Sequence, residues 1–269
     1  MSHLFSDQAL SRRLERAEAS ANAAFVESRA RLSPDRAATW IDVEGTYAMF
    51  DGVDSPCTQT FGFGLFSTPA ANQLDVLEEF FATRGSAVFH EVSPLADPST
   101  LTLLGNRGYR PIELTTVLHR PVGAALAGSS ASDVQVRPIN TDEAGLWADA
   151  SARGWSEQPM LGDFMRDMGI VMTSSKKVTG FVAEIDGVIA ATGALAMHEG
   201  VAMLAGASTI PAFRGRGAQN ALLRARLRMA ADHGCDLAAM GASPGSASQR
   251  NAERQGFLVA YTRTKWART

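Results

Sequence analysis

The sequence is poor in cysteine, the residue that most often builds disulfide frameworks and zinc sites. Of its 269 residues only two are cysteine, Cys57 and Cys235, and they form neither a C-x-x-C pair nor a Cys/His ligand spacing. Disulfide-stabilised folds and structural zinc are therefore not indicated. Two buried thiols in a reducing compartment are the simpler interpretation, and we expect no metal.

Long apolar runs and an excess of basic charge are also missing. No uninterrupted apolar stretch approaches the roughly 18 residues that a membrane span needs, and the N-terminal segment is mixed and charged. The net charge of -3 offers no basic field for a nucleic acid. These absences predict a cytoplasmic protein whose partners include neither a membrane nor a nucleic acid.

What is present is an ordinary globular composition, with 45% hydrophobic and 20% charged residues. The length fits one large domain or two modest ones. Small uncharged residues gather between 122 and 133, which predicts a linker and two domains, 1–125 and 131–269. Residues 1–130 hold 10 basic and 15 acidic side chains, whereas 131–269 hold 15 and 13. An anionic ligand should therefore prefer the second half.

The second half alternates strand and helix signals in the order β-α-α-β-β-β-α-β-α-β. Asn140 and Glu143 form a capping box before a helix that Gly154 ends, and a second helix is expected over 160–172. Three antiparallel strands are predicted at 180–185, 188–197 and 201–210, joined by Asp-Gly and Glu-Gly turns. A helix over 218–233, a strand at 235–242, a short helix over 247–254 and a last strand from 257 follow.

The first half repeats the end of this pattern. A helix over 72–83, a strand at 87–92, a Ser-Pro pair, a helix over 99–104 and a Gly-aromatic pair before a strand correspond to the elements from 218 onward. Gly108 precedes Tyr109 as Gly256 precedes Phe257. Two divergent copies of one supersecondary unit explain this better than coincidence.

The segment most informative about chemistry joins the strand at 201–210 to the helix at 218. Gly215 and Gly217 allow backbone N–H groups to turn into the loop, Arg214 and Arg216 add positive charge, and the helix N-terminus adds its partial charge. A pyrophosphate would fit this anion-binding loop. A dinucleotide fingerprint would need glycine at Asn220, and a P-loop would need Gly-Lys-Ser/Thr. A helix-start turn that uses glycine only for geometry remains the structural alternative.

The run P-A-F-R-G-R-G-A-Q-N-A-L-L from Pro211 resembles the P-x-x-R-G-x-G-x-G/A-x-x-L-L motif of the GNAT superfamily of acyl-CoA-dependent N-acetyltransferases. The resemblance covers about residues 134–268, because the next strand and the helix leading to Gly-Phe also match. Two positions depart from the motif. Gln219 replaces a small residue, and Ala252 stands where many members carry the tyrosine that protonates the leaving thiolate.

The resemblance implies an α/β fold with two GNAT-like units, each a mixed, mostly antiparallel sheet flanked by helices. It makes 131–269 the N-acetyltransferase domain with acetyl-CoA as cosubstrate. It makes 1–125 a degenerate copy, because residues 66–73 (FSTPAANQ) cannot build the loop. The residues expected to contact CoA are Ser208, Thr209, Ile210, Arg214, Gly215, Arg216, Gly217, Ala218, Gln219, Asn220 and Asn251.

The chemistry requires a group that removes the amine proton and a group that returns one to the thiolate. Backbone N–H groups of the strand at 201–210 are candidates to hold the thioester oxygen, and Gly206 is the expected site of a bulge that exposes them. That strand has no carboxylate, which leaves Glu157, in the loop between the first two helices, as candidate base. Tyr261, in the last strand, is the candidate acid.

These two candidates, and four other polar or aromatic residues of the second half, also have a structural interpretation. Glu157 fits a solvated surface charge, and Tyr261 fits a half-buried core side chain. His198 and Glu199 fit an exposed turn, Ser246 fits a helix cap before it fits a contact with CoA, and Trp155 fits the core as well as an acceptor pocket.

The sequence thus predicts direct transfer of an acetyl group from acetyl-CoA to an unidentified amine, most simply a small molecule. A homodimer is compatible with the sequence. The alternatives are a non-catalytic CoA-binding or sensing protein, because the usual tyrosine and carboxylate are absent, and a protein that binds another nucleotide phosphate in the same loop.

Overall fold

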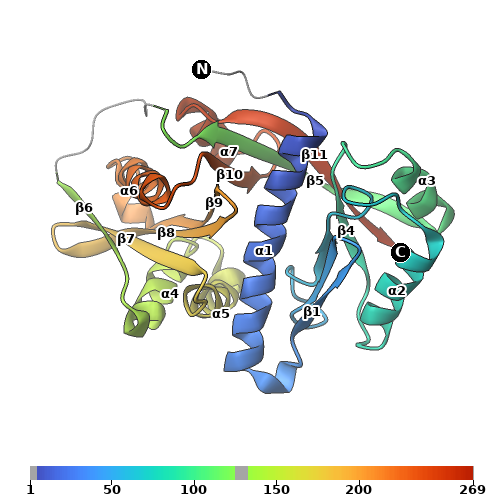
Figure 1. The fold of residues 1–269 in the computed structure, drawn as a ribbon. Helices are drawn as coiled ribbons and strands as arrows, with labels where there is room; N and C mark the ends of the chain where they lie inside the picture. Colours follow the sequence, from blue (N-terminus) through green and yellow to red (C-terminus); the bar gives the residue numbers. More distant parts are fainter. Residues whose placement is uncertain (1–4, 125–132, 269) are drawn as a thin grey trace. The chain divides into compact units, whose positions relative to one another are not determined.

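The computed structural model describes residues 5–124 and 133–268, which form seven α-helices and eleven strands. Its contacts divide the chain into two compact units. The first unit comprises Met1–His119 and Gly241–Thr269, and the second unit comprises Arg120–Met240. Mixed, mostly antiparallel sheets with flanking helices confirm the predicted α/β class (Figure 1).

The strands of the second unit follow the order β10-β9-β8-β7-β6. They are β6 (Val134–Pro138), β7 (Val178–Ile185), β8 (Val188–His198), β9 (Val201–Thr209) and β10 (Leu237–Ala242). Consecutive strands from β6 to β9 are antiparallel, and β10 joins β9 in parallel. At the predicted Asp186-Gly187 and Glu199-Gly200 turns all four φ angles are positive, between 43° and 80°. Both central residues of a type I′ hairpin need this conformation.

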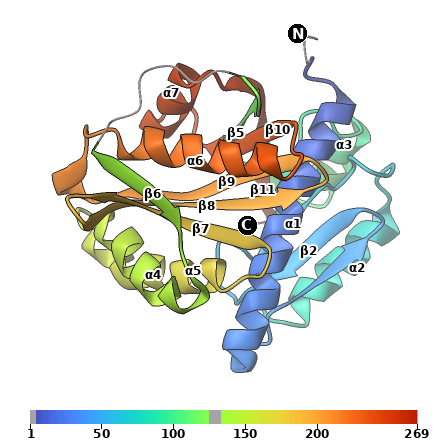
Figure 2. The same ribbon diagram turned by 60° about the vertical axis from the view of Figure 1, so that its left-hand side comes forward.

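Helices cover both faces of this sheet. The helices α4 (Ala144–Arg153) and α5 (Gly162–Thr173) lie on one face, and α6 (Ala218–Asp232) lies on the other (Figure 2). The predicted capping box of Asn140 and Glu143 is present, and Gly154 is the C-cap of α4. Buried Trp147 packs with Val182 and Ala194 between α4 and the sheet.

The first unit is built on the strand order β1-β2-β3-β4-β11-β5. Its strands are β1 (Thr39–Val43), β2 (Thr46–Phe50), β3 (Gln59–Phe61), β4 (Phe89–Val92), β5 (Tyr109–Pro121) and β11 (Leu258–Arg268). Its helices are α1 (Gln8–Leu32), α2 (Ala71–Ala82), α3 (Ser99–Asn106) and α7 (Ala247–Arg254). The small side chains of Ala19, Ala23 and Val26 bring α1 against Met49 and Phe61.

The internal repeat is visible as one connection made twice. Strand β3 continues through α2 to a parallel partner, β4, just as β9 continues through α6 to β10. A short helix then ends before a glycine with φ of 85° (Gly108) or 80° (Gly256), where the next strand begins.

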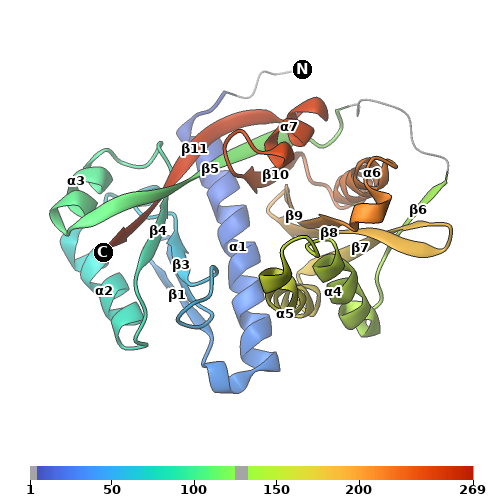
Figure 3. The same ribbon diagram turned by 180° about the vertical axis from the view of Figure 1, so that it is seen from behind.

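The division into units differs from the predicted domain boundary. Strand β11 pairs antiparallel with β4 and with β5, so residues after Met240 are grouped with the first unit (Figure 3). The predicted linker falls largely on residues 125–132, which lie outside the described residues. Helix α1 and the strands β1, β2 and β3 were not predicted from the sequence.

Both cysteines are buried and free, as expected. Within the described ranges, no helix is both long enough and apolar enough to span a membrane. In the same ranges, no three His, Cys, Asp or Glu side chains are grouped in a way that could hold a metal ion.

Candidate active site

The glycine-arginine segment forms an open turn at the N-terminus of α6. After β9 the chain makes a 3₁₀ turn at Pro211–Phe213, and Gly215 and Gly217 follow with φ of 78° and 83°. Gly217 is the N-cap of α6, where no side chain caps the helix and no acidic residue lies in the first turn. The first N–H groups of α6 therefore have no side-chain acceptor, which favours an anion at this end of the helix.

Both arginines of the loop are held by carboxylates. The Arg214 Nη1 atom lies 2.8 Å from Glu157 Oε2, and the Arg216 Nη2 atom lies 3.2 Å from Asp186 and 3.4 Å from Asp133. All five side chains are at least 39% exposed, so solvent screens these pairs and each is weak. An anionic ligand at the loop would compete with the carboxylates for the same guanidinium groups.

Gln219, which departs from the family motif, joins α6 to β8 and to the end of β9. Its Nε2 atom donates to the Ser208 carbonyl at 2.8 Å, to Thr209 Oγ1 at 3.0 Å and to the Thr192 carbonyl at 3.3 Å. The side chain is thus bound to strand acceptors and leaves the backbone N–H groups of the loop uncapped. The sequence identified the departure but not these contacts.

The other residues expected to contact CoA surround this turn. The Ser208 hydroxyl is buried and donates to the Ser151 carbonyl at 2.9 Å. Ile210 N–H donates to the Ala190 carbonyl at 3.0 Å, which fixes the end of β9. Ala218 is buried, whereas Asn220 is exposed. The structure thus gathers in the second unit every predicted CoA contact except Asn251.

The strand that precedes the loop separates from one neighbour and bulges against the other. Strand β9 pairs with β10 from Val201 to Met203, whereas its register with β8 continues to Thr209. That register shifts between Thr192 and Ala194, opposite Gly206, which has a φ of 60°. The predicted bulge at Gly206 is confirmed. A strand with one free edge next to an anion-binding turn can hold an extended acyl chain by backbone hydrogen bonds.

The two candidate proton carriers occupy different environments. Glu157 is 64% exposed and bound to Arg214 in the second unit. Tyr261 belongs to the first unit, where it is buried and its hydroxyl donates to Glu15 Oε1 at 2.8 Å. Burial and the nearby Glu15 carboxylate raise the pKa of Tyr261 well above its usual value. Burial also raises the pKa of Glu15 to about 7.

The remaining candidates take up mainly structural positions. The Ser246 side chain caps α7 by accepting from Gln249 N–H, as predicted. The Asn251 side-chain carbonyl accepts from Arg254 on the same helix in the first unit. Trp155 is half-buried, and His198 lies 3.9 Å from exposed Glu199 at the β8–β9 turn.

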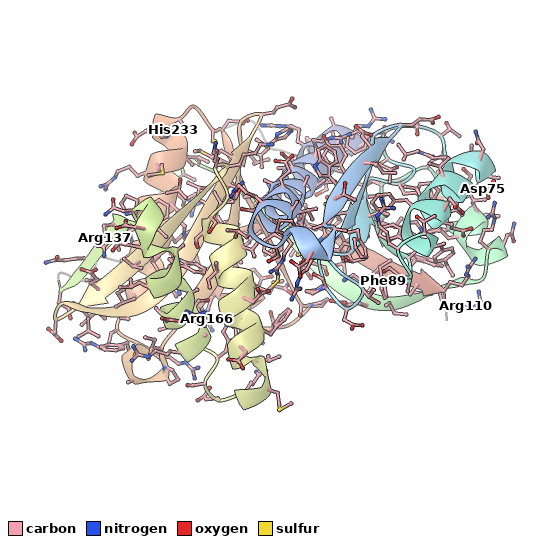
Figure 4. The ribbon with its side chains drawn as sticks, turned by 90° about the horizontal axis from the view of Figure 1, so that it is seen from below. Asp75, Phe89, Arg110, Arg137, Arg166 and His233 are labelled. Atoms are coloured by element: carbon pink, nitrogen blue, oxygen red, sulfur yellow. The ribbon has the colours of Figure 1, made fainter. Side chains whose placement is uncertain are left out.

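The first unit contains a pocket of about 450 Å³ with the opposite charge preference. Its lining includes Asp75, Glu78 and Glu79 of α2 together with Tyr109 and Arg268. Asp75 is labelled in Figure 4, where side chains of this unit and of the second unit, such as Arg137, are drawn as sticks. An acidic pocket repels a pyrophosphate, so this pocket does not compete with the α6 turn for that ligand.

Residues 145–257 match the model of the acetyltransferase (GNAT) family. A similar solved structure is the GCN5-related N-acetyltransferase from Kribbella flavida, at 16% identity and a TM-score of 0.65, covering 91% of this chain and 95% of that one. The GCN5-related N-acetyltransferase from Sphaerobacter thermophilus is also similar, at 17% identity and a TM-score of 0.54. The match covers 86% of this chain and 75% of that one.

A tandem GNAT protein from the clavulanic acid biosynthesis pathway is also similar, at 12% identity and a TM-score of 0.57. It covers 82% of this chain and 77% of that one. A search of curated proteins found no match.

The fold, the uncapped α6 turn and the family match together define an acyltransferase. Residues 145–257 form the segment of the chain that matches the acetyltransferase (GNAT) family.

Proposed function

We propose that the protein transfers an acetyl group directly from acetyl-CoA to the nitrogen of a small amine. The observation that carries the proposal is the uncapped turn of Gly215 and Gly217 at the start of α6, placed directly after a strand with one free edge. The space beside Gly215 is open, because a Cβ there would meet no atom within 4 Å, and the first turn of α6 carries no acidic residue. The turn therefore has room for the pyrophosphate of the cosubstrate and no negative charge of its own to repel it. Backbone N–H groups with Arg214 and Arg216 would hold the pyrophosphate.

Bound acetyl-CoA supplies an activated thioester, whose C–S bond breaks as the C–N bond forms, while the amine loses a proton and the sulfur gains one. The chain itself contributes positioning and hydrogen-bond donors. Backbone N–H groups along the free edge of β9 would orient the acyl arm. The sequence proposes Glu157 to take the amine proton and Tyr261 to return one to sulfur. Glu157 is hydrogen-bonded to Arg214, and the Tyr261 hydroxyl is hydrogen-bonded to Glu15. Each residue would have to break that hydrogen bond before it could transfer a proton.

The first unit is proposed to be a GNAT-like copy without a CoA site. At the place that corresponds to the glycine-arginine turn, the Phe66 ring lies beneath the Arg16 guanidinium at 4.0 Å. A Cβ at Gly45 would meet Phe66 at 2.5 Å, so the ring is tightly packed. The Gln73 amide of α2 donates to the Val43 carbonyl at 3.0 Å. The Phe66 and Gln73 side chains of this segment are thus held by Arg16 and Val43.

A non-catalytic CoA-binding protein is the second candidate. It is favoured by the engagement of the Tyr261 hydroxyl and by the absence of any carboxylate on β9. Both candidate functions require a CoA site. Thermal denaturation with acetyl-CoA, CoA, ATP and NAD tests for that site, because selective binding to the folded state raises Tm. A rise with acetyl-CoA and CoA alone supports a CoA site, and a rise with ATP or NAD refutes it.

A panel of amines, followed by release of free CoA thiol, then separates the two candidates. We expect one class of small amine to accelerate thiol release in a saturable way. Binding of acetyl-CoA without acceleration by any amine, peptide or protein acceptor would favour the sensing role.

A further inference from the structure

Helix α6 carries a buried positive charge on the face that it turns toward the sheet. Arg226 is 4% exposed. Its Nε donates to the Leu222 carbonyl at 3.2 Å, and its Nη1 donates to the carbonyls of Ala194 at 3.3 Å and Ala205 at 3.4 Å. Within the described part of the chain, no carboxylate forms an ion pair with it. Burial lowers the pKa of Arg226 to about 10, so the side chain remains charged at neutral pH.

The two strand carbonyls that bind Arg226 lie at the bulge. Ala194 and Ala205 face each other in the register immediately beside the shift. On this face a Cβ at Gly193 would meet the Arg226 Cζ atom at 2.9 Å, so a side chain there would displace the guanidinium group. Arg226 therefore binds the backbone at the point where β9 no longer pairs with β10.

Trp147 holds the same bulge from the other face of the sheet. Its indole N–H donates to the Phe181 carbonyl at 3.0 Å and to the Gly193 carbonyl at 3.3 Å. A Cβ at Gly206 would meet the Trp147 ring at 2.9 Å. The bulge is thus fixed between a tryptophan on one face and a guanidinium on the other.

A buried cation without a carboxylate partner is costly, and an apolar side chain of similar length would pack there without that desolvation penalty. Negative charge at the bulge during acyl transfer would compensate for it. The Ala205 carbonyl and the Gly206 N–H belong to one peptide group. Donation to that carbonyl polarises the peptide and strengthens its N–H as a donor.

We propose that Arg226 is a positioning residue that fixes and polarises the Ala205–Gly206 peptide, so that the Gly206 N–H donates to the carbonyl oxygen of the acyl thioester. The proposal rests on the proposed acetyl-CoA function. Arg226 acts through the peptide and needs no contact with the acyl group.

The infrared band of the thioester carbonyl tests this role directly, because a hydrogen bond to that oxygen lowers its stretching frequency. We would bind [1-¹³C]acetyl-CoA to the full-length wild type, to Arg226→Met and to Arg228→Met. Arg228 lies on the same helix but is exposed, which makes it a matched control. The expected band is lowered in wild type and Arg228→Met and moves back toward free acetyl-CoA in Arg226→Met. Calorimetry should give acetyl-CoA Kd values within about 3-fold of one another.

A band that stays at the wild-type position in folded Arg226→Met, or that is not lowered in wild type, overturns the proposal. Failure of the wild type to bind acetyl-CoA instead overturns the proposed function. Once an acceptor is known, Arg226→Met should lower kcat by about 10²-fold without a matching rise in KM.

If Arg226→Met does not fold, Arg226→Lys carries the test. Burial would lower the pKa of a lysine at this position, as it lowers that of Arg226, so the lysine would lose its charge at a lower pH than the arginine does. The thioester band of Arg226→Lys should then move toward free acetyl-CoA as the pH rises, whereas the wild-type band stays constant. A band of Arg226→Lys that does not change with pH overturns the proposal.

Discussion

The Glu157–Arg214 pair connects the candidate base to the anion-binding turn. Replacing Glu157 with glutamine removes the carboxylate that competes for Arg214, so acetyl-CoA affinity should rise by about 2- to 5-fold, within the range of an exposed ion pair. Isothermal calorimetry measures this, with exposed Glu199→Gln as the control. If Glu157 is instead the base, kcat should fall by about 10²-fold or more. Unchanged affinity and unchanged kcat together would exclude both roles.

The substitution Tyr261→Phe separates a structural role of the hydroxyl group from a catalytic one. Tyr261→Phe removes the donor to buried Glu15, which should lower the free energy of unfolding by about 1–3 kcal/mol. Urea denaturation measures that loss, and Tyr47→Phe provides a tyrosine control in the same unit. If Tyr261 also protonates the thiolate, kcat should fall by about 10²-fold with acetyl-CoA affinity nearly intact. A destabilised variant with wild-type kcat would remove Tyr261 from the mechanism.

At the scale of single residues, the sequence predicted the positions of the loop side chains better than their partners. Arg214, Arg216 and the two glycines were predictable, because their spacing before an amphipathic helix is a local pattern. The contacts of Gln219 and Arg226 were not predictable. Both side chains reach strand carbonyls that are brought near only by the β8–β9 register, and long polar side chains on a helix ordinarily indicate its solvent face.

At the scale of elements, the turn into α6 should respond to charge more than to size. Gly217→Asp places a carboxylate at the helix N-terminus, and its repulsion with a pyrophosphate is about 1 kcal/mol or more at a few ångströms. Gly217→Asn is the matched control, because asparagine has nearly the same shape and shares the tolerance of aspartate for positive φ. Calorimetry should show a much weaker acetyl-CoA complex for aspartate than for asparagine. Equal affinities would place the CoA site elsewhere.

The β9 bulge gives a second prediction about an element. Gly206→Ala adds a Cβ that would lie 2.9 Å from the Trp147 ring, at a φ of 60°. The combined strain and overpacking should lower the free energy of unfolding by about 2–4 kcal/mol. Gly187→Ala has a similar φ of 73° but meets no atom within 4 Å, so about 1–2 kcal/mol is expected there. Denaturant melts that show equal losses would mean that the Trp147 contact yields.

Elements with strong local signals were predicted well and those without them were not. The hairpin turns, the capping box and the glycine stops appear where the pattern placed them. Helix α1 was not predicted, because its buried face mixes four alanines and two serines with the charged side chains of Glu15 and Arg29. A face of that composition lacks the contrast between apolar and polar positions that indicates a helix.

At the scale of the whole molecule, buried His90 should make folding sensitive to acid. Burial lowers the pKa of His90 to about 3, whereas an unfolded histidine titrates near 6.5. The unfolded state therefore binds the proton first, and stability present above about pH 6.5 is lost as the pH falls toward the folded pKa. From pH 7 to pH 5 the loss is about 2 kcal/mol.

Glu15 acts in the opposite direction, because its raised pKa of about 7 adds stability as the pH falls through 7. The measurement is therefore the difference between variants. Urea melts give the free energy of unfolding at each pH. Between pH 7 and pH 5 this free energy should fall by about 2 kcal/mol more in wild type than in His90→Asn. Exposed His233→Asn should follow the wild type. Parallel profiles for wild type and His90→Asn would mean that His90 is not buried neutral.

The arrangement of the two repeats was only partly accessible from sequence. The copies were recognisable, because each contains the same helix, Ser-Pro, helix and Gly-aromatic series. The position of β11 between β4 and β5 was not, since it pairs Thr264 with residues about 150–170 positions earlier. Pairings at that separation leave no local pattern.

The place of β11 sets an order on synthesis. The ribosome adds residues from the N-terminus, so β4 and β5 leave the exit tunnel long before the strand that lies between them exists. Until then the early half of the nascent chain exposes two unpaired strand edges, which other chains or chaperones can bind. The second unit, Arg120–Met240, has left the ribosome, with β6 to β9 and most of β10, before β11 is made. Translation thus delivers the acetyltransferase loop before the half that precedes it in the gene is able to complete its sheet.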